Sequence, residues 1–490
     1  MSSEKHDVEK QAVTTTTVTA VSSPVLTIPS PTQSPCPQHR PPPVHYPRRP
    51  SSSSSSWSSL DRYPSLPPPS DVPPIAIALE APIGPSDDDA FEPPDGGLRA
   101  WSQVFAAHLI NAMTWGYAGS YGVYQLYYEQ NLGLPASQVS WIGSVQIFLT
   151  FATCALSGRL ADAGHARITA CAGCFLAVLG SFMTSLSTQY WQFLLAQGVC
   201  VGLGLGIAFM PGVSVMSSYF KRNRPFALSV AAMGTSLGGV VFPATVQYVT
   251  PKLGFHWAAR CAAFIALVFS VTACLLLRPY LPARKAGPWV EWAAFRERPY
   301  LLFSLGCFLN FYAMYFGFFY INSYARNIIG FSTIESINLL LITNCMGIPF
   351  RPLAGYLANR FFGPINVFIG ATTGVSILLF CWTAVSTRAG MYAFSVFYGI
   401  VIGANQATFV SALASLTGDP RKMGTRFGMI ESLSSFATLA GTPTAGAIID
   451  TMGGKYLVSQ IWAGAVMGGA VVVFICMRIS LTGMKLRVKV

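Results

Sequence analysis

Long apolar segments recur from residue 101 to residue 479, and they constrain the fold more than any other feature of the sequence. Each is close to the roughly 20 residues that an α-helix needs to cross the hydrocarbon core of a bilayer. The segments cover residues 101–124, 139–158, 168–188, 190–216, 226–249, 257–280, 301–325, 334–357, 364–386, 390–415, 427–450 and 457–479. The sequence therefore predicts an all-α membrane protein with twelve transmembrane helices.

Composition and charge agree with a membrane protein and argue against nucleic acid as a partner. Hydrophobic residues make up 52% of the 490 residues and charged residues only 10%, whereas about a quarter of a soluble protein is charged. The net charge is +12, yet the first 100 residues are acidic, with 7 Lys or Arg and 11 Asp or Glu. The basic excess thus lies in loops between helices, which is the pattern that orients a membrane protein.

The cysteines and histidines point to no disulfide framework, metal site, cofactor or enzyme. Ten of the eleven cysteines, from Cys154 to Cys476, lie within or beside apolar segments, where free cysteine behaves as a small hydrophobe. Cys171 and Cys174 form a CxxC in the middle of an apolar segment, and only His108 among six histidines lies well inside a predicted helix. A membrane-embedded enzyme needs clustered His, Asp or Glu, so the expectation is a protein that is not an enzyme.

The chain divides into five regions. Residues 1–93 are rich in Ser, Thr and Pro, which predicts a disordered cytosolic tail acting as a spacer or a regulatory arm. A six-helix bundle at 94–281, a bridge at 282–300, a second six-helix bundle at 301–480 and a short tail at 481–490 follow. With a cytosolic amino terminus, 18 Lys and Arg fall in cytosolic loops and the carboxyl tail, against four in the opposite loops. This bias predicts that both termini are cytosolic.

An internal repeat relates the two bundles. The offset between matching residues is 197 positions, or six helices, so each half has the same orientation in the membrane. Gly158, Leu160 and Ala161 recur as Gly355, Leu357 and Ala358, and Gly202 and Gly206 recur as Gly399 and Gly403. A six-plus-six transporter architecture is the expected result.

Short motifs resemble those of a known transporter family. The segment from Gly158 to Arg167, GRLADAGHAR, resembles the signature between helices two and three of the major facilitator superfamily, with its second glycine one place early. Pro94-Asp95-Gly96-Gly97, followed by Trp101, resembles the motif before helix one of the monocarboxylate porter family. Arg351-Pro352 and the segments at 219–224 and 424–429 resemble the fungal branch of that family. The resemblance implies the MFS fold and a secondary transporter.

The first motif supplies candidate gating residues. Asp162 ends the second predicted helix and can face the start of helix eleven, where Arg426 and unpaired backbone N–H groups present positive charge. Asn359 takes the equivalent place in the second half, with Arg360 beside it. The resemblance adds Gly158 and Arg167 to this gate, and the alternative is a loop cap without a gating role.

Arg351 is the strongest candidate for contact with a substrate. It lies inside the eighth predicted helix, where a cation is costly unless it is paired or hydrated, and its planar fork suits a carboxylate. The alternative is a salt bridge to Glu431, which is also a candidate proton-coupling residue. The family resemblance implies an Asp four residues before this arginine, but Gly347 stands there, and helix one has no Lys.

Other polar residues inside helices are candidate cavity ligands or interhelical contacts. His108 and Asn111 share a face of helix one, and His108 could also couple a proton. Asn310 and Tyr312 in helix seven and Gln406 in helix ten complete the set of predicted substrate-binding residues. Helix seven is also rich in aromatic residues between Phe308 and Tyr324, which suits either a flat ring system or packing against a neighbour.

The resulting prediction is an MFS transporter that moves a small-molecule substrate, an organic anion, by alternating access in a lipid bilayer. Proton coupling stays open. The plasma membrane is favoured over the vacuolar membrane as its location. The alternative cargo is a secondary metabolite that the protein exports, or a vitamin such as riboflavin.

Overall fold

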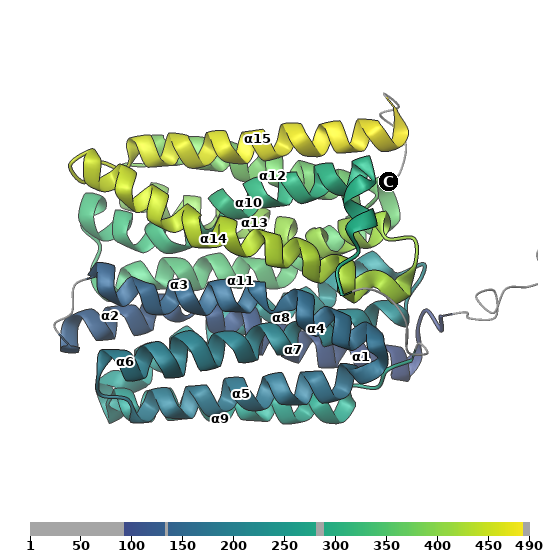
Figure 1. The fold of residues 1–490 in the computed structure, drawn as a ribbon. Coiled ribbons are helices and arrows are strands. Elements are labelled where there is room, and N and C mark those ends of the chain that lie inside the picture. Colours follow the sequence, from purple (N-terminus) through teal and green to yellow (C-terminus); the bar gives the residue numbers. More distant parts are fainter. Residues whose placement is uncertain (1–92, 133–135, 281–288, 484–490) are drawn as a thin grey trace, which may run out of the picture. The chain divides into compact units, whose positions relative to one another are not determined.

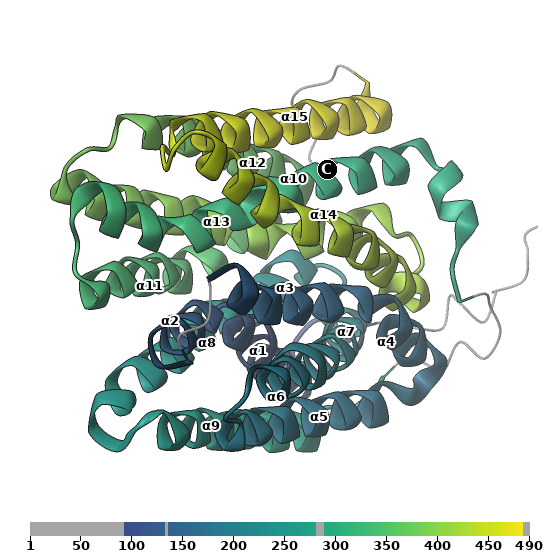
Figure 2. The ribbon, with the colours of Figure 1, turned by 60° about the vertical axis from the view of Figure 1, so that its left-hand side comes forward.

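Helices account for almost all of the regular structure, and they run side by side between two faces of the protein (Figures 1 and 2). The computed structural model describes residues 93–132, 136–280 and 289–483. The predicted tail at 1–93 lies almost entirely outside the described residues, as does most of the tail at 481–490.

The first half supplies six of the twelve helical stretches in the described part of the chain. They are α1 (Gly97–Asn111) with η1 (Ala112–Gly116) and α2 (Tyr121–Leu132); α3 (Ala136–Ala152) with α4 (Cys154–Leu160); α5 (Ala166–Leu186); α6 (Tyr190–Phe193), η3 (Leu194–Val201) and α7 (Gly202–Ser218); α8 (Arg224–Leu253); and α9 (Phe255–Leu276).

The second half supplies the other six. They are α10 (Arg298–Tyr324) with η5 (Ala325–Ile329); α11 (Thr333–Leu357) with η6 (Ala358–Phe362); α12 (Pro364–Cys381); α13 (Arg388–Leu416); α14 (Met423–Thr451); and α15 (Leu457–Thr482). Each stretch coincides with one of the twelve apolar segments, so the predicted twelve-helix, six-plus-six membrane fold is confirmed.

Nine helices within the described ranges are long and apolar enough by themselves to span a membrane. One of them, Gln138–Leu186, holds two crossings, because Gly164 at φ 88° turns the chain back between them. The first stretch is not among the nine, because a turn at Gly119 and Ser120 divides it and because it carries polar residues such as Gln103, His108 and Asn111. Neither is α14, which carries Arg426, Glu431 and Asp450 and is rich in Ser, Thr and Gly.

The first helical stretch is longer than predicted. It starts at Gly97 and, after the turn, continues to Leu132 rather than ending near residue 124. Aromatic packing explains the extension: the ring of Tyr127 stacks on Phe255 at 3.8 Å, and the ring of Tyr128 lies 4.3 Å from Phe193.

Two pairs of helices join the halves. α14 packs on α3 and α4, and α11 packs on α8. A Cβ atom at Gly158 would collide with the carbonyl oxygen of Gly424, and one at Gly355 would collide with Ser229. Glycine at these two repeat-related positions therefore lets the halves approach closely, backbone to backbone at Gly158.

We name the two faces by their residues. The face where α4 ends and α14 begins carries Lys221, Arg360 and Lys422 and is called the basic face. The face where α10 ends and α11 begins is called the opposite face.

Candidate functional site

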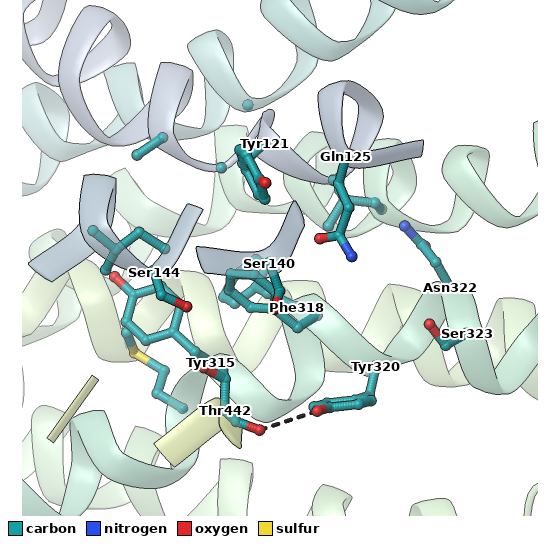
Figure 3. A pocket seen from close by; sticks show the side chains of 18 of the residues that line it. Tyr121, Gln125, Ser140, Ser144, Tyr315, Phe318, Tyr320, Asn322, Ser323 and Thr442 are labelled. Carbon is teal, nitrogen blue, oxygen red and sulfur yellow. Dashed lines mark hydrogen bonds between the residues drawn. The ribbon is translucent and has the colours of Figure 1, made fainter. Parts of the chain in front are cut away.

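A cavity of about 970 Å³ lies between the two halves. Its lining includes Thr333 at the start of α11 and Gly454 and Tyr456 between α14 and α15, so it reaches the opposite face. Figure 3 shows Gln125, Ser140 and Ser144 of the first half across from side chains of the second half. The volume is at the upper end of the range for cavities that enclose a drug-sized ligand.

Arg351 forms part of the cavity lining, and it connects both halves. The side chain is 3% exposed, and its Nε donates a hydrogen bond to Ser236 Oγ of α8 at 2.8 Å. Its Nη2 donates to Gln406 Oε1 of α13. No ion pair joins Arg351 to a carboxylate in the described part of the chain. A buried guanidinium held only by neutral groups favours an anion as its missing partner.

Glu431 does not pair with Arg351, so the alternative salt bridge is wrong for this conformation. The side chain is 2% exposed, and its Oε2 atom has no hydrogen-bond partner. Cys154 of α4 and Cys307 and Tyr315 of α10 lie near it. Glu431 therefore lies at the contact between the halves, next to Tyr315 in the cavity wall.

Three of the six predicted substrate-binding residues line the cavity, namely Asn111, Arg351 and Gln406. The other three are bound between helices instead. His108 Nδ1 lies 3.1 Å from the carbonyl oxygen of Val230, and Tyr312 Oη lies 3.0 Å from Thr444 Oγ1. Asn310 Oδ1 accepts a hydrogen bond from Asn405 Nδ2 at 3.3 Å. Because a polar group in a dry helix interface needs a partner, these side chains turn toward neighbouring helices.

The sequence prediction missed most of the cavity wall. Small polar residues of α3 and amides of α2, α10 and α11 carry no motif, and Gln125 lies past the predicted end of its helix. They include Gln125, Ser140, Ser144, Asn322 and Asn344. The aromatic residues of α10 did carry a signal, since Phe311, Tyr315 and Phe318 follow helical spacing and all three line the cavity.

On the basic face, Asp162 caps the start of α14. Its Oδ1 accepts from Gly424 N–H at 3.1 Å, and its Oδ2 accepts from Thr425 N–H and Thr425 Oγ1, both at 2.7 Å. Ser214 Oγ adds a bond of 3.1 Å to Oδ1. The predicted meeting of Asp162 with unpaired N–H groups of this helix is therefore present, and it joins the two halves.

The predicted partner role of Arg426 is wrong in its details. Its Nε lies 3.2 Å from Glu291 Oε2, and its Nη1 lies 3.0 Å from Glu297 Oε2. Arg426 therefore pairs with acidic residues of the bridge rather than with Asp162. Lys422 Nζ also binds Glu291 Oε1 at 2.7 Å. Burial alone would raise the pKa of Glu291, but hydrogen bonds and charge from Lys422 and Arg426 hold that pKa below its ordinary value.

At the repeat-related position of the second half, a hydrogen bond between neutral side chains takes the place of the Asp162 contact. Asn359 Nδ2 donates to Asn223 Oδ1 at 3.2 Å, and Asn223 is the N-cap residue of α8. Arg360 and Arg167 are exposed, and Arg167 Nε donates to the carbonyl oxygen of Cys274 at 3.2 Å. The gating role of both arginines stays a prediction.

The motif before helix one also has a defined contact. The Asp95 carboxylate accepts from the backbone N–H groups of Lys221 at 2.6 Å and Arg222 at 2.9 Å. Asp95 itself has φ 50°, a left-handed conformation that Asp tolerates better than most residues. The motif thus fixes the start of α1 against the loop between α7 and α8.

Comparison with known proteins identifies the family to which this arrangement is similar. The family model described as Major Facilitator Superfamily matches residues 104–442. An MFS-type transporter of Gibberella zeae is 39% identical over 389 residues, covering 79% of this chain and 88% of the relative. The Aspyridones efflux protein of Emericella nidulans is 35% identical over 394 residues, covering 80% of each chain.

Solved structures share the fold at low sequence identity. The human organic anion transporter MFSD10 superposes with a TM-score of 0.62 at 16% identity, covering 78% of this chain and all of that one. The Escherichia coli fucose:proton symporter superposes with a TM-score of 0.58 at 18% identity, covering 77% of this chain and 99% of that one.

Proposed function

The chain belongs to the major facilitator superfamily, and from this premise we propose that it is a secondary active transporter that exports an organic anion of secondary metabolism. One observation carries the proposal. A buried guanidinium, Arg351, lies in a cavity between the halves, and its hydrogen-bond partners Ser236 and Gln406 are both neutral. An anionic group of the cargo completes its charge pairing.

Export is favoured over uptake of a small acid on two grounds. Relatives include proteins named for efflux of aspyridones and of agnestins, and a cavity of about 970 Å³ is far larger than a three- or four-carbon acid requires. A carrier of small monocarboxylates, in keeping with the Asp95 motif, is the alternative.

The proposed cycle is alternating access about this cavity. The basic excess in the loops favours a cytosolic basic face and cytosolic termini, so the conformation described here opens outward. In this conformation Asp162 and Asn359 hold the basic face closed. Release of these contacts opens the cavity to the cytosol, where a metabolite for export enters. The plasma membrane is the proposed location.

Proton coupling through Glu431 is a second element of the proposal. A carboxyl group buried without a hydrogen-bond partner is costly as an anion and favours the neutral acid. Separation of α14 from α4 during the cycle would change the surroundings of Glu431 and release its proton. A coupling role for His108 has less support, because its ring is fixed to Val230 O between α1 and α8.

The test begins with an untargeted metabolite comparison of cells with and without the protein, inside and outside the cell. The acid that accumulates inside cells lacking the protein is then assayed for flux in proteoliposomes. We expect Arg351→Ala to abolish flux of that acid while the protein stays folded in the membrane. Full flux by Arg351→Ala, or the absence of any accumulated acid, would contradict the proposal.

A further inference from the structure

A stripe of aromatic side chains on α10 forms one wall of the cavity. Phe311, Tyr315 and Phe318 are spaced at i, i+4 and i+7, so they share a face of the helix. Tyr315 and Phe318 are half-buried, and Figure 3 shows both at the cavity. At about 1.5 Å per residue, the stripe from Phe311 to Phe318 is about 10 Å long.

The deep end of the stripe, at Phe311, is closed by aromatic rings of both halves. We call this end the floor of the cavity. Phe311 lies 5.2 Å from Phe151 of α3 and 5.3 Å from Phe409 of α13, measured between ring centroids. All three are at most 6% exposed. Above this floor, Tyr315 has ring neighbours at 6.3–6.4 Å, and Phe318 has Tyr398 at 6.1 Å. None of these rings stacks face to face on Tyr315 or Phe318. The ring faces of Tyr315 and Phe318 therefore remain available to a ligand.

Arg351 is tied to the same end of the stripe. Gln406 accepts from Arg351 through Oε1, and its Nε2 lies 3.8 Å from Met314 Sδ, a residue of α10 between Phe311 and Tyr315. The guanidinium thus lies near the deep end of the aromatic wall, and the rings extend from it toward the opposite face.

The wall across the cavity carries aromatic residues too, among them Trp115, Tyr121 and Trp141, but it also adds hydrogen-bonding groups. Ser140 and Ser144 of α3 and Gln125 of α2 present small or polar side chains opposite Tyr315, Phe318 and Asn322 (Figure 3). The other charged residues of the lining, Arg326 and Asp450, are near its mouth, at the ends of α10 and α14. The described cavity therefore combines one deep cation, the aromatic wall of α10 and a facing wall with hydrogen-bonding groups, which is called the polar wall.

We propose that the cargo is a planar, conjugated acid. Its rings lie along α10 against Tyr315 and Phe318, its acidic group binds Arg351, and oxygen substituents on its rings face Ser140, Ser144 and Gln125. This inference rests on the proposed transport function and specifies its substrate class. Offset or edge-to-face contact with a ligand ring adds affinity beyond area burial, about two- to tenfold for each protein ring.

Binding of matched probes to the purified full-length protein in nanodiscs tests the proposal. The probes are 2-naphthoate, its saturated and puckered counterpart decahydro-2-naphthoate, and neutral 2-naphthamide. We expect 2-naphthoate to bind about tenfold tighter than the saturated acid and the neutral amide. Phe318→Leu and Tyr315→Leu should each reduce the preference for the flat acid by two- to tenfold.

Control variants separate ring contact from general damage. Tyr315→Phe keeps the ring and should keep the preference. Phe308→Leu removes a ring of the same helix that stacks on Tyr312, 6.4 Å away, and lies outside the cavity lining. It should also leave the preference unchanged. Equal binding of the flat and saturated acids to the wild type, or an unchanged preference in Tyr315→Leu and Phe318→Leu, would overturn the inference.

The same assay distinguishes this inference from the function on which it rests. Arg351→Gln should weaken both acids to the level of the amide. If both acids bind equally and depend on Arg351, the anion site stands and the aromatic cargo does not. If neither acid depends on Arg351, the proposed anion site itself fails.

A second pair of probes tests the polar wall. Anthraquinone-2-carboxylate should bind several-fold tighter than anthracene-2-carboxylate, because its ring oxygens can accept hydrogen bonds from the serine hydroxyls and the glutamine amide. The double variant Ser140→Ala, Ser144→Ala should reduce this difference. Equal affinity of the two acids for the wild type would remove the assigned role of the polar wall.

Discussion

At the scale of single residues, Asp162 illustrates how one carboxylate can join two halves of a transporter. It is 8% exposed, and three of its four hydrogen bonds come from Gly424 and Thr425 across the boundary. Hydrogen bonds to a charged acceptor contribute about 1.5–3 kcal/mol each. Because the donors include the free N–H groups of a helix start, the contact forms only when α4 and α14 are together.

We predict that Asp162→Asn weakens closure of the basic face. The amide keeps one acceptor oxygen but loses the second, so the backbone N–H of either Gly424 or Thr425 is left without its acceptor. The loss of about 1.5–3 kcal/mol shifts the population by roughly 10- to 100-fold toward the open form. Labelling of a cysteine introduced at Ser214, beside Asp162, measures this opening.

The repeat-related position provides the control. Asn359→Ala removes one neutral hydrogen bond to Asn223 and should increase labelling by less than Asp162→Asn does. Equal labelling of the wild type and Asp162→Asn would show that the carboxylate is not a latch.

The residue types in the sequence identified some residues of the site, but not the groups that these residues contact. Arg351 and Asp162 could be identified from the sequence because a charged side chain inside or at the end of a membrane helix is costly, and is therefore usually functional. The partner of Arg351 could not be read from spacing, since Ser236 and Gln406 are 115 and 55 positions away. Likewise, nothing in the spacing of His108 distinguishes a cavity ligand from a side chain fixed to Val230 of the adjacent helix.

At the scale of helices, the break between α3 and α4 is completed by another helix. Ala155 N–H donates to Ser432 Oγ of α14 at 3.1 Å, and that hydroxyl in turn donates to the carbonyl oxygen of Ala152 at 2.8 Å. A serine of the second half therefore replaces a backbone hydrogen bond that the interrupted helix lacks. Apolar periodicity predicted the helix but could not predict this break, because its cause lies 277 residues away.

We predict that Ser432→Ala destabilises the conformation described here by about 1–3 kcal/mol, since it leaves Ala155 N–H buried without an acceptor. The measurement is the thermal unfolding temperature in detergent, together with labelling of the basic face. Ser435→Ala is the matched control, because Ser435 Oγ donates within α14 itself, to Ser432 O at 2.7 Å. Equal effects of the two substitutions would refute the bridging role of Ser432.

At the scale of the whole protein, the two halves close the basic face unequally. The first half contributes a charged latch at Asp162, whereas the second half contributes the neutral Asn359. The start of α14 is also fixed to the bridge, where Glu291 binds both Lys422 and Arg426. The sequence predicted the two halves and their repeat, but for the bridge at 282–300 it predicted only the position.

The Glu291 cluster predicts a dependence of stability on pH. Because the pKa of Glu291 is lowered in the folded protein, its contribution is present above the ordinary carboxyl pKa and is lost as the pH falls through the lowered value. We expect acidification to weaken the hold on α14, and Glu291→Gln to be less stable than the wild type near neutral pH. The difference should shrink in acid.

Thermal unfolding of both proteins across this pH range measures the effect. Asp419→Asn is the control, since the exposed Asp419 carboxylate accepts from the backbone N–H of Arg421, two residues away, and the amide oxygen can keep this contact. A stability difference between the wild type and Glu291→Gln that does not change with pH would contradict the assignment.

The central claim is that two six-helix halves rock about the cavity that contains Arg351. Electron–electron distance measurement tests it most directly, with spin labels on a cysteine-free background at His165 and Asp419 on the basic face, and at Gln138 and Lys455 on the opposite face. These four positions are exposed. If the halves rock in this way, the basic-face distance lengthens during turnover in the same population in which the opposite-face distance shortens. Distances that stay fixed, or that lengthen together, would contradict it.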